Sequence, residues 1–254
     1  MSHQIKEPGF FMAKDLNNFI TRKWQPHSEH KERSVELWVF LFLIVPSLVL
    51  SFFAVRQGRL SFLLISIATI FRDLSLLSLI LFFIWRNREP ITALGWTAPS
   101  VRKEISIGIA LFIPLFLAAS ILESALHKAG LSAPSTPLPA LVSERGITEF
   151  ILALLLVIVV AVVEETIFRG YLMLRIKEVT SSPAAAVLLS AVIFSLGHGY
   201  EGTASVVTIG VMGAFFALIY QWRRSLTAPI VMHFLQDFIG IVLIPFLKQT
   251  HFFH

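Results

Sequence analysis

The sequence of 254 residues contains no cysteine, and this absence excludes disulfide bonds and thiol chemistry. Charged residues are scarce as well, at 15% of the chain, whereas ordinary soluble domains carry about 25%. Hydrophobic residues make up 56% of the sequence. A composition with so few charged and so many hydrophobic residues is not that of a soluble globular domain, and it indicates a membrane protein.

Long apolar runs recur along the chain, at about the 20 residues that a helix needs to cross roughly 30 Å of hydrocarbon. They predict an all-α fold, a polytopic transmembrane bundle of about seven helices. The predicted spans are residues 35–55, 60–85, 105–126, 147–174, 184–198, 203–221 and 226–247. We expect no cleavable signal peptide, because residues 1–34 are polar and mixed in charge.

A proline-rich stretch at residues 133–139 divides the apolar runs into two groups. It predicts a stiff connector, because proline has no amide donor with which to continue a helix. We therefore divide the chain into an N-terminal tail (1–34), three leading transmembrane helices (35–130) and a core of four helices (147–247).

Lysine and arginine favour alternate loops, and this pattern predicts the orientation of the chain. With the tail on the cytoplasmic side, the basic residues at 86–103, 175–177 and 223–224 all lie inside as well. We expect a cytoplasmic N-terminus in a prokaryotic inner or plasma membrane. The net charge of +5 then reflects topology, and no nucleic-acid partner is expected, since that would require a clustered basic face.

Ionisable side chains stand within the predicted core helices. Such groups cost about 2.5–3.5 kcal/mol each at membrane depth, and they usually serve a function. Three sets are present, and they comprise Glu164, Glu165 and Arg169; His198; and His233 with Asp237. The three sets occur on helices that are otherwise nearly free of charge, and this favours one shared site over separate structural pairs.

The spacing within each set predicts a division of roles. Glu165 and Arg169 are four residues apart, so they share a helix face and should form an internal strut. Glu164 is turned by about 100° from Glu165 and is free to face a cavity. His233 and Asp237 are also four apart, which lets the carboxylate orient the imidazole. A cavity that holds Glu164, His198 and His233 would bind and activate one water molecule.

Arg72 and Asp73 lie in the middle of the second predicted helix, with no motif around them. Adjacent residues point to different faces of a helix, so we expect a structural or cavity-lining role for both.

In their order along the chain, the three sets resemble the motifs of the CAAX prenyl protease and bacteriocin-processing family of intramembrane proteases, also called the Abi or Rce1-like family. That family carries Glu-Glu-x-x-x-Arg, then Phe-x-x-x-His, then His-x-x-x-Asn or Asp, each on a separate transmembrane helix. Here the motifs are EETIFR (164–169), FSLGH (194–198) and HFLQD (233–237). The resemblance covers residues 147–240.

The resemblance implies hydrolysis of a peptide bond within the membrane, in a peptide or a membrane-anchored protein. Glu164 corresponds to the family's catalytic glutamate, and His198 to a residue that helps to hold the attacking water. His233 and Asp237 correspond to the motif that forms the oxyanion site or orients water. We favour a mechanism with no cofactor. The alternative is a zinc ion held by Glu164, His198 and His233, because two histidines and a glutamate form a legitimate zinc set.

Other interpretations of the polar residues remain open. The sequence contains no Gly-x-Ser-Gly or Gly-x-Gly-Asp motif, so serine and aspartate intramembrane proteases fit less well. A proton- or ion-coupled transporter would use the same buried carboxylates and histidines as a relay. An inactive scaffold is a third interpretation, although a scaffold would have no need for the whole set of motifs.

Overall fold

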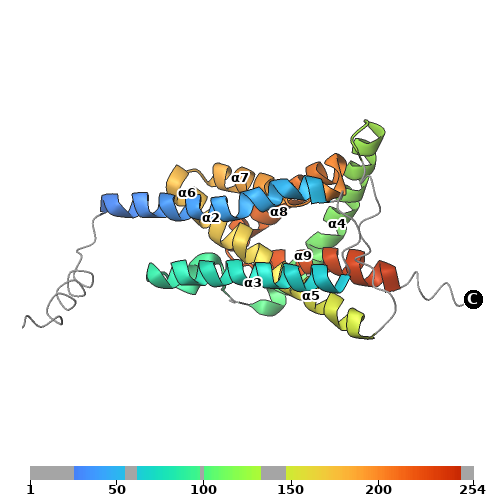
Figure 1. The fold of residues 1–254 in the computed structure, drawn as a ribbon, viewed down its shortest axis with the longest axis horizontal. Coiled ribbons are helices and arrows are strands. Elements are labelled where there is room, and N and C mark those ends of the chain that lie inside the picture. The colour runs from blue at the N-terminus through green and yellow to red at the C-terminus, as the bar shows by residue number, and fades with distance from the viewer. Residues whose placement is uncertain (1–25, 55–61, 98–99, 133–146, 247–254) are drawn as a thin grey trace, which may run out of the picture.

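The protein is described by a computed structural model that covers residues 26–54, 62–97, 100–132 and 147–246 (Figure 1). Throughout these ranges the regular structure is helical, and no strand occurs. The prediction of an all-α bundle is therefore confirmed. Most of the helices lie along the long axis of the molecule, and α4 crosses this direction (Figure 1).

The α-helices are α2 (Pro26–Ala54), α3 (Phe62–Arg86), α4 (Val101–Lys128), α5 (Ile147–Glu165), α6 (Met173–Thr180), α7 (Pro183–Leu196), α8 (Thr203–Arg223) and α9 (Thr227–Asp237). Two short 3-10 turns are η1 (Ile91–Leu94) and η3 (Gly199–Glu201), and two π-helical segments are η2 (Thr166–Leu172) and η4 (Phe238–Leu243). Because α5, η2 and α6 follow one another without a break, they form one helix over residues 147–180, which we call the central helix.

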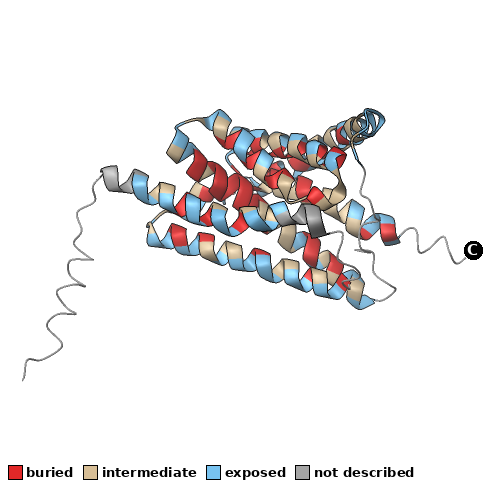
Figure 2. Ribbon diagram, turned by 45° about the horizontal axis from the view of Figure 1, so that its top comes forward, coloured by how far each residue is buried: buried red, intermediate tan, exposed pale blue. Residues whose placement is uncertain are grey.

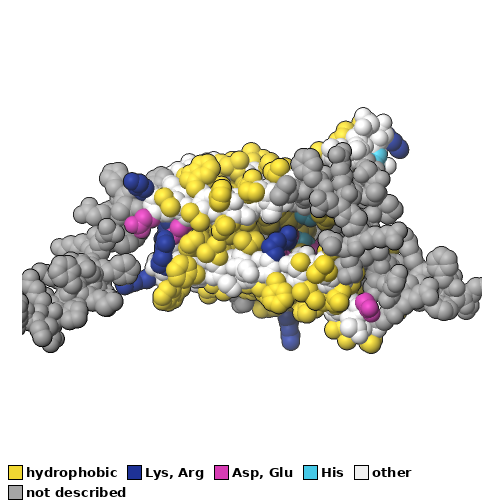
Figure 3. Space-filling model, in the orientation of Figure 1, with side chains coloured by type: hydrophobic (Ala, Val, Ile, Leu, Met, Phe, Trp, Pro, Cys, Tyr) yellow, Lys and Arg dark blue, Asp and Glu magenta, His cyan; other side chains and the backbone are white. Residues whose placement is uncertain are grey.

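Within the described ranges, five helices are long and apolar enough to cross a membrane. They are Phe62–Arg86, Val101–Lys128, Ile147–Thr180, Thr203–Arg223 and Thr227–Phe246. Their outer surfaces carry large exposed hydrophobic side chains, and a soluble monomer rarely exposes so much apolar area (Figure 3). The protein is thus an integral membrane protein.

Two differences from the sequence-based prediction bear on the topology. Helix α2 begins at Pro26, inside the predicted tail of residues 1–34. Helix α7 has only 14 residues, or about 21 Å at 1.5 Å per residue, and is too short to cross the hydrocarbon alone. The predicted span 184–198 is therefore a short helix, capped at its start by Ser182 and Pro183. Residues 1–25 of the tail and the predicted connector lie outside the described ranges.

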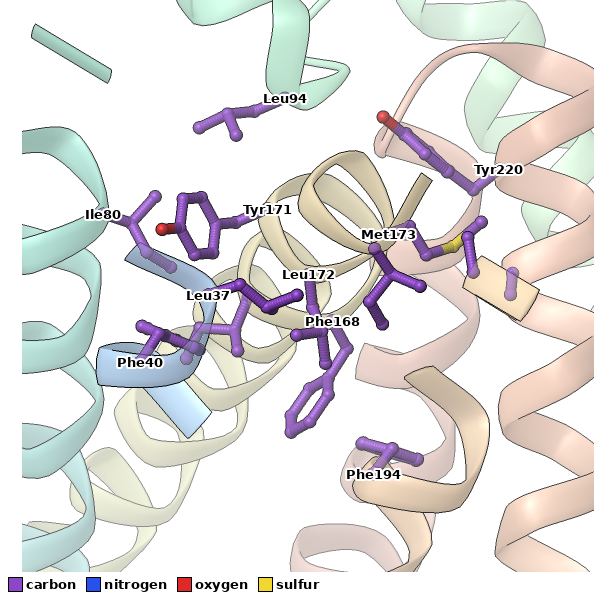
Figure 4. Close-up of a cluster of buried hydrophobic side chains, with 14 of the residues drawn as sticks. Leu37, Phe40, Ile80, Leu94, Phe168, Tyr171, Leu172, Met173, Phe194 and Tyr220 are labelled. Atoms are coloured by element: carbon purple, nitrogen blue, oxygen red, sulfur yellow. The ribbon is translucent and has the colours of Figure 1, made fainter. Parts of the chain in front are cut away.

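The central helix is surrounded by the rest of the fold. Every residue of η2 is buried, and the buried residues concentrate around this segment (Figure 2). Figure 4 shows the hydrophobic cluster around it, to which five other elements contribute. The contributing side chains include Leu37 and Phe40 of α2, Ile80 of α3, Leu94 of η1, Phe194 of α7 and Tyr220 of α8.

Close packing at η2 depends on Gly170. A Cβ atom there would lie 2.8 Å from the carbonyl oxygen of Leu94, which is too close for any larger residue without a backbone shift. The glycine that follows Arg169 thus lets η1 lie directly against the central helix. Burial of this segment fixes the rotation of Arg169 within it and of the two glutamates just before it.

Ion pairs join α2, α3 and α6 at the end of the bundle where α3 terminates. Glu36, which is almost fully buried in α2, accepts hydrogen bonds from Arg86 and from Asn87. Arg175 of α6 donates to Glu89 at 2.6 Å and to Glu178 at 2.8 Å. This charged cluster holds the N-terminal half of α2 against the end of α3, on the side that was predicted to be cytoplasmic.

Candidate active site

The centre of the site is an ion pair inside the central helix. Nη1 of Arg169 donates a hydrogen bond to Oε1 of Glu165 at 2.8 Å, and both side chains have 0% of their surface exposed. Glu165 is the last residue of α5, and Arg169 lies in the π-helical segment η2. The strut that the four-residue spacing predicted is present.

Aromatic rings enclose the Arg169 guanidinium. Its Cζ atom lies 4.4 Å from the ring centroid of Phe194 and 5.3 Å from that of Phe216. Such contacts stabilise a cation away from water, by about 2 kcal/mol or more when it is desolvated. Nη2 also donates to the carbonyl oxygen of Gly213 at 3.3 Å. Phe194 is the first residue of FSLGH, and its contact with Arg169 was not predicted from the sequence.

His233 is bound from both sides by carboxylates. Its Nδ1 lies 2.8 Å from Oε1 of Glu165, and its Nε2 lies 3.5 Å from Oδ2 of Asp237. The four-residue pairing with Asp237 is therefore present. We expected Glu164 to face His233, but Glu165 is the direct partner of the imidazole. The rotation of α5 against α9 decides which of two adjacent glutamates meets the histidine, and the sequence does not encode that angle locally.

Glu164 lies on the more open side of the central helix, with 15% of its side chain exposed. Its direct charged contact is with Arg72 of α3, whose Nη2 lies 3.6 Å from Oε1 of Glu164. The charges of His233 and Asp237 also act on Glu164, which therefore belongs to the same cluster. Glu164 and Glu165 thus have different surroundings, as the sequence predicted, although their partners differ from those we expected.

Arg72 and Asp73 form a pair with each other. Nε and Nη2 of Arg72 lie 2.9 Å and 2.8 Å from Oδ1 of Asp73. Our expectation that adjacent residues point apart fails here, because the arginine side chain is long enough to fold back over its neighbour. The structural or cavity-lining role stays a prediction for Asp73, whereas Arg72 also contacts Glu164.

His198 lies just beyond the end of α7, in the turn that leads to η3, rather than on the helix itself. Its Nδ1 lies 3.3 Å from the carbonyl oxygen of Phe194, and the two rings are 5.1 Å apart. Burial in this turn lowers the pKa of His198, because desolvation disfavours the imidazolium ion. Asp237 and His233 act on His198 electrostatically, so FSLGH and HFLQD meet here.

Two neighbours of His198 were not singled out from the sequence. The side chains of Tyr200 and Glu201 are hydrogen-bonded to each other, and the Glu201 charge acts on His198. Burial raises the pKa of the Glu201 carboxyl group above its usual range. Their position directly after FSLGH was the one sequence signal that could have suggested a link to the site.

The site opens toward a hollow in the side of the molecule. Figure 3 shows basic, acidic and histidine side chains in this hollow, between two bands of hydrophobic side chains at mid-length. Arg72, with 49% of its side chain exposed, Asp237, with 21%, and Glu164, with 15%, are accessible charged members of the cluster, whereas Glu165 and Arg169 are sealed inside.

The residues of the zinc set named above do not fit a metal ion. In the part of the chain that the structure describes, no three histidine, aspartate or glutamate side chains are grouped so as to hold a metal ion together. Glu164, His198 and His233 do not form such a ligand set in this arrangement. We derive no step through a metal, and independence from a cofactor stays a prediction.

The fold and the site define a helical integral membrane protein with a cluster of carboxylates and histidines in its interior. Residues 146–239 match the family model described as type II CAAX prenyl endopeptidase Rce1-like. This match spans all three motifs and confirms the family that they predicted, which implies a protease and hence a hydrolase. Searches of curated proteins and of solved structures found no match.

Proposed function

We propose that this protein is an intramembrane endopeptidase in which Glu164 activates a water molecule. The observation that carries the proposal is the contrast between the two adjacent glutamates. Glu165 is fully buried and bound to both Arg169 and His233, whereas Glu164 is partly exposed on the side of the hollow. A carboxylate that must accept a proton from water has to be reachable by water, and of the two adjacent glutamates Glu164 meets that requirement.

In the proposed reaction, Glu164 accepts a proton from water, and the oxygen attacks the carbonyl carbon of the scissile peptide bond. The tetrahedral intermediate then collapses, and the leaving nitrogen takes up a proton as the bond breaks. Glu165 holds the Nδ1 side of the His233 ring, and the Nε2 side, 3.5 Å from Asp237, binds the water and the developing oxyanion together with His198.

The substrate class that we propose is a peptide or a membrane-anchored protein that enters the hollow from the side of the bundle. The apolar bands around the hollow fit a chain that arrives within or along the bilayer (Figure 3). The basic ends of α3, α6 and α8 support a cytoplasmic location for that end of the bundle, and hence for the N-terminus. We propose a prokaryotic inner or plasma membrane as the location.

The experiment compares purified wild type with Glu164→Ala and with the control Glu149→Ala, which lies in the first turn of the same helix, away from the site. The substrate is a farnesylated peptide that ends in a CAAX sequence and carries a fluorophore and a quencher on opposite sides of the expected cut. We expect cleavage by the wild type and by Glu149→Ala, and none by a folded Glu164→Ala. Full activity of Glu164→Ala would refute the assignment of the base.

Natural substrates are sought with Glu164→Gln, which keeps the shape of the side chain but cannot accept the proton. Peptides that copurify with this variant and not with the wild type are identified by mass spectrometry and then offered to the wild type. Cleavage of a trapped peptide supports the proposal. Uptake of a solute into proteoliposomes, without any peptide product, would instead favour the transporter.

A further inference from the structure

Arg72 is a cation that the proposed mechanism leaves without a role. With Asp73, it supplies the only charges in α3 before Arg86 at the end of the helix. Charged side chains within a membrane helix are costly, and they usually serve a function. Residues 62–86 also lie outside the segment 146–239 that matches the family model, so the match assigns nothing to them.

The geometry around Arg72 fixes the direction of its guanidinium group. Asp73 is almost completely buried; its Oδ1 accepts a hydrogen bond from Nε of Arg72, and it lies 2.8 Å from Nη2. Two contacts with one anchored oxygen hold the planar group in place more firmly than a single contact would. The group so held faces Glu164, at 3.6 Å between Nη2 and Oε1. That distance is too long for a hydrogen bond, but it is a direct contact of opposite charges.

Arg72 is also the cation in direct contact with the Glu164 carboxylate. Among the residues that the structure describes, it is the one arginine or lysine whose nitrogen lies within 4.0 Å of the Glu164 carboxylate. Arg169 is committed to Glu165 and to the two aromatic rings. The carboxylates of Glu165 and Asp237 both act on Glu164 with like charge, and the charges of His233 and Arg72 oppose this repulsion. Of these two, Arg72 makes the direct contact with the Glu164 carboxylate.

We propose that Arg72 is a positioning residue that completes the active site, holding the Glu164 carboxylate where it receives the proton from water, with Asp73 as its anchor. The proposal rests on the proposed peptidase function, and it makes one of the leading helices part of the catalytic unit. The arrangement needs no contact between Arg72 and the substrate. Removal of Arg72 should therefore slow the chemical step and leave substrate binding in place.

The kinetic test uses Arg72→Gln and Arg72→Lys, with Arg88→Gln as the control, because Arg88 is an exposed arginine just beyond the end of the same helix. With the farnesylated fluorogenic peptide, we expect Arg72→Gln to lower kcat by about 10- to 100-fold while KM changes little, since a misplaced catalytic group costs rate rather than affinity. Arg72→Lys keeps the charge and should recover part of kcat. Arg88→Gln should match the wild type.

A second measurement needs no substrate. The melting temperatures of Arg72→Gln, Glu164→Gln and the double variant form a cycle, in which residues in contact give effects that do not add. We expect the loss caused by Arg72→Gln to shrink when Glu164 is already neutral. Additive losses would show that the two side chains do not interact, and they would overturn the proposal whatever the activity.

The outcomes separate this proposal from the function on which it rests. A wild type that does not cleave the peptide, or a Glu164→Gln variant that does, counts against the peptidase function. Equal kcat in wild type and Arg72→Gln overturns only the role of Arg72. A rise in KM at unchanged kcat also overturns it, because Arg72 would then be a residue that binds the substrate.

Discussion

Replacing Glu165 by alanine leaves the Arg169 guanidinium without its carboxylate in the interior of the central helix. Both side chains are fully buried, and Glu165 also accepts from His233, so one substitution removes two charged contacts. Breaking a buried ion pair in this way costs about 3–5 kcal/mol, because the remaining charge stays desolvated. Phe194 and Phe216 still flank the guanidinium and offset only part of that loss.

The expected result can be expressed as a melting temperature in detergent. For a chain of this size, 1 kcal/mol corresponds to about 2–4 °C, so Glu165→Ala should melt about 6–20 °C below the wild type. The double variant Glu165→Ala/Arg169→Met should recover much of this loss, because it removes the unpaired charge as well. Exchange of the two residues should recover less, since an arginine at position 165 would confront His233.

The control for this experiment is Glu149→Ala, in the first turn of α5 and away from the ion pair. It should melt within about 2 °C of the wild type, as substitutions outside the core usually do. The reasoning would be refuted if Glu165→Ala melted as close to the wild type as that control. A double variant Glu165→Ala/Arg169→Met that proved less stable than Glu165→Ala alone would refute it equally.

Further predictions concern packing, topology and metal dependence. Gly213→Ala should lower the melting temperature and slow cleavage, because the added Cβ atom would lie 3.2 Å from the Phe194 ring and 3.4 Å from Nη2 of Arg169. The control Gly210→Ala should be tolerated, because its Cβ atom would lie at an ordinary contact distance of 3.5 Å from Ser195. Because the chain has no cysteine, Lys177→Cys and Lys128→Cys can each be labelled alone with a membrane-impermeant maleimide. Only Lys128→Cys should react in intact cells, and the reverse pattern would invert the topology. Activity should persist after treatment with EDTA and 1,10-phenanthroline, and a loss that zinc restores would contradict the metal-free mechanism.

Much of this arrangement could be predicted from local sequence. Apolar length predicted the long helices, and the four-residue spacing predicted both the Glu165–Arg169 pair and the His233–Asp237 pair. Such patterns work because they depend only on the geometry of a single helix. The short apolar run 184–198 does form a helix, but apolar composition does not show where such a helix ends, and His198 lies in the turn beyond it rather than on the helix.

Contacts between side chains on different helices could not be predicted from the residue spacing within one helix. The partner of His233 is Glu165 rather than Glu164 because of how α5 is rotated against α9, and a rotation of one residue is about 100°. Arg72 contacts Glu164 although the two residues are more than ninety positions apart in the sequence, and no sequence motif predicts this contact. Phe194 stacks its ring on the Arg169 guanidinium, and Gly213 accepts a hydrogen bond from it through its carbonyl oxygen. Neither contact can be recognised from a single sequence.

The π-helical segment η2 has a consequence for how this helix tolerates change in length. A π-turn holds one residue more than an α-turn, so it behaves as an insertion that the helix absorbs without breaking. Loss of one residue from this segment would restore ordinary α-geometry and leave the two flanking parts of the helix in nearly their present relative orientation. Loss of one residue from α5 has no such outlet, and it would turn everything beyond the deletion by about 100° relative to the residues before it. The central helix can therefore change in length by one residue at η2 at far smaller cost to its orientation than in α5.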